Sequence, residues 1–272
     1  MGKLLLLLLI MQERTTSSGL SFLEADFSFY ELMGIQSGYT YPHLNSKREA
    51  QAGITLYPSS IKYGYLGWSY SEGLSVAVRY LNSGEMEMRD ERGNLLGTFT
   101  YQLIDPILSY THPLSEKLFL YTLLGVMYEG AEEYKNYVFH MDVGGKYFLS
   151  RKSSLIFILR NMGWNREKIS LPVFAELSIS YNWDIINTVF SLEYWKGYGP
   201  FFTLSMHREL TPSLGLYYSF NSKRGIYENE GLDPVEASSL GLKIMKGKIT
   251  LLFAYTPAEA GDIYCTNLSI GF

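Results

Sequence analysis

Two short stretches of the sequence pair a histidine with a carboxylate at a spacing that could support proton transfer. His140 and Asp142 in "FHMDV", and His207 and Glu209 in "MHREL", stand two residues apart. In an extended strand this spacing places both side chains on one face, about 7 Å apart. Catalysis would also need a serine nucleophile with an orienting group, and a zinc site would need a spacing such as His-Glu-x-x-His. Neither accompanies these pairs, so we interpret both as hydrogen-bonding groups and predict no enzymatic activity, no metal site and no cofactor. An activity that disappears in His140→Ala would overturn this interpretation.

The composition is unusual for a water-soluble protein. Charged residues make up 18% of the chain, against about 25% in a typical globular domain. The chain also carries 23 Tyr and 15 Phe, with a mean hydropathy of −0.02. A net charge of −4 provides no basic surface for nucleic acid, so we predict no such partner. Cys265 is the single cysteine, which excludes a disulfide within the chain.

The N-terminus resembles a secretory signal peptide. In "MGKLLLLLLIM", one cation precedes an apolar run from Leu4 to Met11, and polar residues follow. The run is far shorter than the roughly 20 apolar residues of a transmembrane helix. We predict that 1–18 is a signal peptide, cleaved near Thr16 to Gly19, and that 19–47 is an N-terminal plug or periplasmic segment. The alternative is the apolar N-terminus of an intracellular protein.

From Arg48 onward, apolar residues alternate with small or polar ones. In "GLSVAVRYL", Leu74, Val76 and Val78 lie on the face opposite Ser75, Ala77 and Arg79. Turn signals separate about 14 such segments of about 9 to 13 residues, whereas a soluble strand usually has about 5 or 6. A tilted strand needs about 9 to 11 residues to cross a bilayer. The segments are joined alternately by tight and longer loops, which predicts an up-and-down arrangement.

The second face of these segments decides between a soluble sandwich and a membrane barrel. A sandwich would present a highly charged face to water, whereas here the second face carries mainly Gly, Ser, Ala, Asn and Thr. We therefore predict an all-β fold: a transmembrane antiparallel β-barrel over 48–272 with its apolar face on lipid. Aromatic residues near strand ends would form interfacial girdles: Tyr63, Tyr65, Trp68, Tyr137, Tyr147, Trp183, Tyr194, Trp195 and Tyr255.

Charged and histidine residues within the predicted strands would be costly on the lipid face, so we expect them to line the lumen. We favour pairing of these groups across the lumen, with a solute path as the alternative. The candidate lumen-lining residues are Arg79, His140, Asp142, Lys146, Arg160, Glu176, His207, Glu209 and Lys243.

Several segments, in order, are similar to one family of bacterial outer-membrane proteins. They are "SFLEADFSFYELMG", "RDERGNLLGTF", "DVGGKY" and "NMG". Their order resembles the PorV/PorQ family, which is related in fold to the fatty-acid transporter FadL. The resemblance implies a 14-stranded barrel that acts in transport or in protein export, including type IX secretion. The chain departs from the family at "GIQSGYTYPHLNSKREAQAG", where a glycine- and alanine-rich segment is expected.

The C-terminal stretch "DIYCTNLSIGF" predicts where the protein is inserted. Tyr264, Leu268, Ile270 and Phe272 form one apolar row, which resembles the C-terminal signal that the barrel-assembly machinery reads. We expect this strand to close the barrel against a first strand near Arg48 to Tyr57. These features predict the bacterial outer membrane as the location and its lipid as a partner.

Two functions are compatible with these observations. The barrel could pass a small hydrophobic solute or receive secreted proteins and secretion components at its loops. The alternative is a plugged structural or interaction barrel without transport, whose candidate surface is the polar loop "NSKRGIYENEGLDP".

Overall fold

The computed structural model describes residues 33, 48–57, 60–70, 73–89, 92–131, 134–165, 171, 173–195, 199–224, 226–227, 231–258 and 261–272. The predicted signal peptide, 1–18, lies outside the described residues. The same holds for the predicted plug segment, 19–47, apart from Met33.

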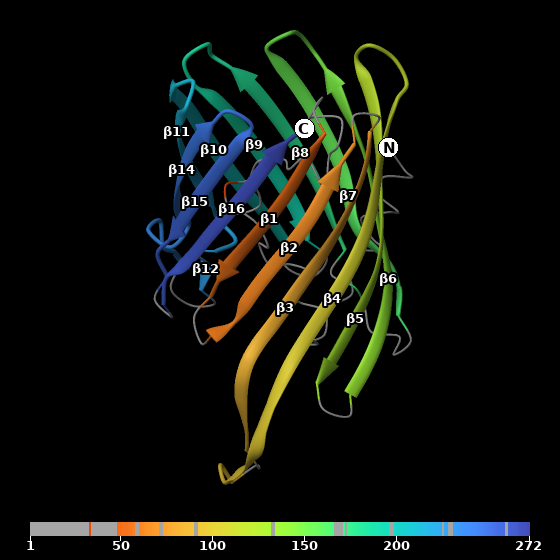
Figure 1. Cartoon of the computed structure of the whole chain (residues 1–272), viewed down its shortest axis with the longest axis vertical. Helices are drawn as coiled ribbons and strands as arrows, with labels where there is room; N and C mark the ends of the chain where they lie inside the picture. Colours follow the sequence, from red (N-terminus) through yellow and green to blue (C-terminus); the bar gives the residue numbers. More distant parts are fainter. Residues whose placement is uncertain are drawn as a thin grey trace.

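The chain folds into a closed 14-strand antiparallel β-barrel, which confirms the predicted fold class and strand number (Figure 1). Consecutive barrel strands are neighbours throughout, and the last strand pairs with the first. The short strands β12 (Ile226–Tyr227) and β13 (Gly231–Leu232) form a separate ribbon. The barrel strands are β1 (Glu49–Leu56), β2 (Lys62–Ser69), β3 (Leu74–Arg89), β4 (Leu95–Pro113), β5 (Leu118–Ala131), β6 (Tyr134–Phe148), β7 (Ser153–Asn165), β8 (Phe174–Asn182), β9 (Asn187–Trp195), β10 (Gly199–Thr211), β11 (Leu214–Asn221), β14 (Ser238–Lys246), β15 (Ile249–Thr256) and β16 (Ile263–Gly271).

The two ends of the barrel differ in their connections. At the end where β1 begins and β16 ends, the strands are joined by short turns such as 212–213 and 247–248. We call this the turn end, and the opposite end, which carries the long connection 222–237, the loop end. No α-helix that is long and apolar enough to cross a membrane occurs in the described part of the chain.

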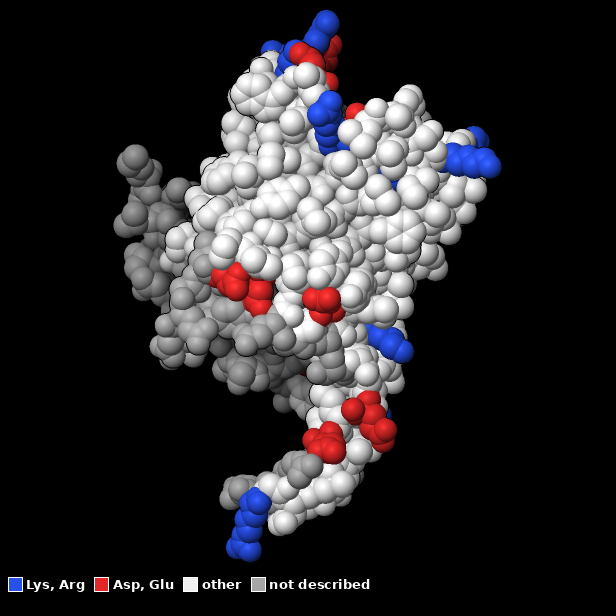
Figure 2. Space-filling view, turned by 90° about the vertical axis from the view of Figure 1, so that its left-hand side faces the viewer, with Lys and Arg blue, Asp and Glu red and all other residues white. Residues whose placement is uncertain are grey.

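The apolar row faces outward in most strands, as predicted. Because successive side chains in a strand point to opposite faces, the exposed and buried residues alternate along β16 and β4. The side of the barrel in Figure 2 shows the result: a broad uncharged band separates charges near the turn end from charges nearer the loop end. Such a band is what hydrocarbon requires of a barrel exterior. Around the whole barrel exterior, the exposed apolar residues include Leu66, Val76, Val78, Leu108, Phe139, Leu177, Phe190, Leu216, Phe253 and Leu268.

The girdle prediction was wrong for three of its aromatic residues. Tyr63, Tyr65 and Trp195 are 3%, 4% and 2% exposed and point into the barrel. The reason is visible in "KYGYLGWS", where both rows of the strand carry aromatic residues and alternation alone does not tell which row meets lipid. Of the other predicted girdle residues, Tyr194 is half-buried, whereas Trp68, Tyr137, Tyr147, Trp183 and Tyr255 are exposed.

Strands β3 and β4 continue beyond the other strands as a hairpin arm at the loop end (Figure 1). They have 16 and 19 residues, longer than the predicted strand length. The apolar outward row of β3 ends at Tyr80, after which Asn82, Glu85 and Glu87 follow. Since carboxylates are not tolerated against hydrocarbon, the part of the exterior of β3 that could face lipid ends at this level.

The barrel closes as predicted, by pairing of β1 with β16. Two contacts reach across β1 to join β16 to β2. On the outside, the rings of Phe272 and Trp68 stack with centroids 5.0 Å apart. On the inside, the Asn267 amide donates a hydrogen bond to the Tyr65 hydroxyl. This inner bridge passes over Gly53, where a methyl group would lie 2.4 Å from Asn267 Oδ1.

Candidate functional site in the barrel lumen

The inner wall of the barrel has two chemically different parts. Along β2 to β7 about half of the buried inward residues are apolar, and these form two clusters, whereas along β8 to β14 many are hydroxyl-bearing. We call these parts the apolar wall and the hydroxyl wall. The hydroxyl wall includes Ser178, Ser191, Thr203, Ser205, Ser219 and Ser239.

The apolar wall consists of two clusters. The loop-side cluster comprises Tyr63, Leu81, Tyr101, Leu103, Met127, Val138 and Leu171. The turn-side cluster comprises Tyr65, Ala77, Ile107, Tyr121, Leu123, Ile156 and Ile158. On β3 and β4, one inward position lies between the two clusters, and it carries Arg79 and Asp105 respectively.

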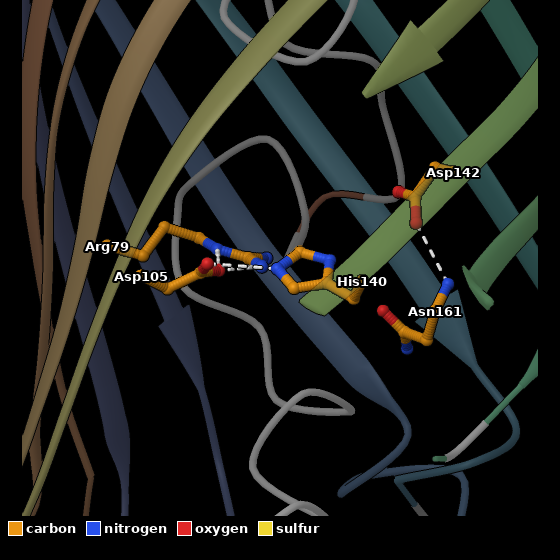
Figure 3. A network of polar contacts seen from close by, with 5 residues as sticks. All are labelled: Arg79, Asp105, His140, Asp142 and Asn161. Carbon is orange, nitrogen blue, oxygen red and sulfur yellow. Dashed lines mark hydrogen bonds and ion pairs between the residues drawn. The ribbon is translucent and has the colours of Figure 1, made fainter. Parts of the chain in front are cut away.

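Arg79, Asp105 and His140 form a buried ionic stripe across β3, β4 and β6 (Figure 3). Arg79 donates to Asp105 Oδ2 through Nε at 2.9 Å and through a second guanidinium nitrogen. The other carboxylate oxygen, Oδ1, lies 2.9 Å from Nε2 of His140. The three residues are 9%, 0% and 1% exposed. Opposite charges in direct contact offset part of the cost of burying each of them.

The intervening strand, β5, permits this stripe because it carries Gly125 at the crossing. A methyl group there would lie 2.1 Å from His140 Nε2 and 2.9 Å from Asp105 Oδ1, so the contact requires glycine. Pro106 follows Asp105 and has no N–H to donate to a ladder. The β4–β5 register accordingly passes from Ile104 to Ile107 without a partner for the two residues between them.

His140 and Asp142, the first candidate dyad, lie on the same inward row but bind different groups. Asp142 Oδ1 accepts a hydrogen bond of 2.8 Å from the backbone N–H of Asn161. This contact sits at a bulge between β6 and β7, where Asn161 has a positive φ of 56°. Asp142 therefore anchors a backbone irregularity, while His140 belongs to the ionic stripe.

The remaining candidates also lie on inward rows, but they pair along the wall rather than across the lumen. Arg160 on β7 contacts Glu176 on β8 at 2.9 Å. Lys146 lies near the turn end of β6, with Nζ 4.9 Å from the centroid of the Phe148 ring. The prediction that these groups pair across the lumen was therefore wrong. Partners on adjacent strands lie within contact distance, whereas residues on opposite sides of the lumen are farther apart.

The second candidate dyad forms part of a cluster near the turn end. Glu209 Oε1 accepts a hydrogen bond of 2.7 Å from Lys243 and lies 3.5 Å from His207 Nε2. The His207 ring stacks on Tyr217 with centroids 4.8 Å apart. Glu209 and Lys243 come from β10 and β14, and Gly215 on β11 lies between them. Among the described residues, no group of three or more His, Cys, Asp or Glu side chains could hold a metal ion.

Sequence reasoning missed Asp105, Glu129 and Glu193. In "YQLIDPILSY" both rows of the strand are mainly apolar, so alternation did not mark Asp105 as an inward residue. Glu129 accepts hydrogen bonds from Tyr101, Tyr134 and Asn136 at 2.5, 2.8 and 2.7 Å. The available signal was the charge itself, since a carboxylate in the middle of a membrane strand must face inward.

Comparison of the sequence with models of protein families and with curated proteins finds no match. Comparison of the structure does find similar barrels. The toluene transporter TodX of Pseudomonas putida aligns with a TM-score of 0.61 and 8% identity, over 92% of this chain and 99% of that one. The chain has a FadL-like barrel fold.

Two further structures support this FadL-like assignment of the fold. The toluene transporter TbuX of Ralstonia pickettii aligns with a TM-score of 0.60 and 9% identity, over 92% of this chain and 98% of that one. A FadL homologue of Pseudomonas aeruginosa gives 0.54 and 9% identity, over 83% and 90%.

Proposed function

We propose that the protein is an outer-membrane transporter that passes small apolar solutes. The observation that carries this proposal is the apolar wall. A membrane barrel that conducts polar solutes has a polar interior, whereas here β2 to β7 present two buried apolar clusters inward. Such a wall binds solutes that leave water readily, since removing apolar area from water is favourable by about 25 cal/mol per Å².

The structural neighbours agree with this proposal. TodX and TbuX are toluene transporters, and toluene is a small apolar solute. We assign the turn end to the periplasm and the loop end to the cell exterior, because outer-membrane barrels have short periplasmic turns and longer external loops. The arm of β3 and β4 then projects from the cell surface.

Toluene uptake by Gram-negative cells tests the proposal. Cells that produce the protein are expected to take up labelled toluene several-fold faster than cells with an empty vector. Leu103→Asn, which puts an amide into the apolar wall, should reduce this uptake, whereas Ser191→Asn in the hydroxyl wall should not. Equal uptake by producing and control cells, with the barrel present in the outer membrane, contradicts the proposal.

A second candidate is the binding of secreted proteins, as the resemblance to PorV/PorQ implies. The arm favours it, because within the described residues β3 beyond Asn82 and β4 before Tyr101 pair with each other but with no further barrel strand, and such outer strand edges can pair with another chain. Leu95 and Leu96 in the arm are also 57% and 61% exposed. Removing 84–98 should then lower secretion and recovery of a cross-linked secreted partner; unchanged secretion contradicts this function.

A plugged scaffold without transport is the third candidate, and Met33 favours it. This residue is fully buried and packs against the inward side chains of Leu252, Ala254, Ile263 and Cys265. Met33, the one described residue of 19–47, therefore lies against the inner wall. Removal of 19–47 would raise toluene uptake if the segment blocks the lumen, and would leave it unchanged if the solute passes beside the segment.

A further inference from the structure

The imidazole of His140 has one nitrogen atom that the wall leaves without a partner. Nε2 lies 2.9 Å from Asp105 Oδ1, whereas Nδ1 has no hydrogen-bond partner among the residues that the structure describes. The side chain is 1% exposed, so bulk water is kept from it. Buried polar atoms are nearly always hydrogen-bonded, so a buried atom without a partner is a candidate for binding a ligand.

The ionic stripe determines what kind of partner Nδ1 can take. The Asp105 carboxylate is an acceptor, so Nε2 of His140 must donate to it. Arg79 also binds that carboxylate and offsets its charge, so the contact does not require a charged imidazole. A neutral ring with its proton on Nε2 presents a lone pair at Nδ1. In this neutral form of the ring Nδ1 is an acceptor, and the ligand that it binds is a donor.

The surroundings of His140 define the rest of the ligand. Met127 and Val138 of the loop-side cluster and Leu123 of the turn-side cluster occupy the neighbouring inward positions on β5 and β6. A ligand at Nδ1 would therefore lie beside apolar side chains of both clusters. In Figure 3, Nδ1 points away from Asp105, toward the side on which Asp142 lies. A ligand carboxylate would meet that negative charge and could not donate to Nδ1.

We propose that Nδ1 of His140 accepts a hydrogen bond from the hydroxyl group of a phenol or a small alcohol in the lumen. The proposal rests on the proposed function, and it narrows the substrates from apolar solutes in general to hydroxyl-bearing ones. The hydroxyl loses its water on entering the apolar wall, and the bond to Nδ1 replaces that water. A hydrocarbon of the same shape has no hydroxyl to desolvate, but it also leaves Nδ1 without a donor.

Three ligands of matched shape test the proposal: toluene, p-cresol and 4-methylbenzoate. Their binding to the purified full-length protein in detergent micelles is measured by equilibrium dialysis, with empty micelles subtracted. p-Cresol is expected to bind about tenfold more tightly than toluene, as one additional hydrogen bond implies. 4-Methylbenzoate is expected to bind no better than toluene.

Substitution of His140 should remove the preference and leave the affinity for toluene. His140→Phe should bring p-cresol to the level of toluene, and the matched His207→Phe should leave the preference unchanged. His140→Gln serves if the phenylalanine variant does not fold. Equal affinity of the wild-type protein for p-cresol and toluene overturns the inference, as does tighter binding of 4-methylbenzoate. If neither toluene nor p-cresol binds, both the proposed function and the role of His140 are wrong. If both bind with equal affinity, only the role of His140 is wrong.

Discussion

The apolar wall and the hydroxyl wall each contain one polar bridge built in the same way. In the first, Asp105 on β4 reaches His140 on β6 over Gly125. In the second, Glu209 on β10 reaches Lys243 on β14 over Gly215. In both bridges the middle strand carries a glycine, and the side chains of the two strands on either side of it make contact across that glycine.

The difference between the two bridges lies in their surroundings. Asp105 is fully buried between two apolar clusters, whereas the side chain of Glu209 is 37% exposed. A buried charge that loses its partner is costly, but an exposed ion pair contributes little because water solvates both charges. We therefore expect the burial of the charged groups to determine how much each bridge contributes to the free energy of unfolding.

The largest expected effect is that of removing the carboxylate from each bridge. Asp105→Ala removes the buried carboxylate that Arg79 and His140 contact and should lower the free energy of unfolding by about 3 to 5 kcal/mol. Glu209→Ala should cost less than about 1 kcal/mol. Urea unfolding of both variants in the same micelles, followed by tryptophan fluorescence, measures the difference. Similar losses in the two variants would show that burial does not distinguish the bridges.

The two bridging glycines provide the next test. A methyl group on Gly125 would lie 2.1 Å from His140 Nε2 and 2.9 Å from Asp105 Oδ1, both of them buried groups. On Gly215 it would lie 3.0 Å from Glu209 Oε2, at the free end of a flexible side chain. Gly125→Ala should therefore lower the free energy of unfolding by about 1 to 3 kcal/mol. Gly215→Ala should stay within about 0.5 kcal/mol of the wild type. An unchanged free energy of unfolding in Gly125→Ala would contradict the close contact of His140 and Asp105 over this glycine.

The seam of the barrel contains a third bridge of this kind, between two neutral residues. Asn267 on β16 reaches Tyr65 on β2 over Gly53. Both residues are buried but neutral, so the loss of the contact should lie between the two extremes. Tyr65→Phe should cost about 1 to 1.5 kcal/mol in the same unfolding measurement. A loss as large as that of Asp105→Ala would indicate that seam position, and not charge, sets the cost.

The sequence was sufficient for the barrel because the relevant signal is local. Alternation along each strand and the tight turns between strands predicted the number of strands, the lipid-facing row of most of them and the pairing of β1 with β16. These features depend on neighbours in the chain, where a period of two is directly visible.

The site was less predictable because its contacts cross strands. His140 and Asp142 are adjacent on one row, yet the structure joins His140 to Asp105, 35 positions away in the chain. That contact depends on Gly125 and on the register of β4, β5 and β6, which alternation does not encode. The sequence therefore predicted which side several charged residues face, but not which residues they contact.

The outer face of the seam gives a small expected effect on stability and separates two roles of Phe272. Its ring stacks on Trp68 across β1, and an exposed aromatic pair contributes about 0.5 to 1 kcal/mol. Trp68→Ala removes the stack but keeps the C-terminal residue, so it should lower the unfolding free energy slightly and leave the amount of barrel in the outer membrane unchanged. Deletion of Phe272 removes the stack and also the end of the proposed assembly signal, so it should reduce that amount as well. Equal amounts of the two variants in isolated outer membranes would mean that Phe272 acts through packing alone, because a residue read by the assembly machinery must matter before the barrel has formed.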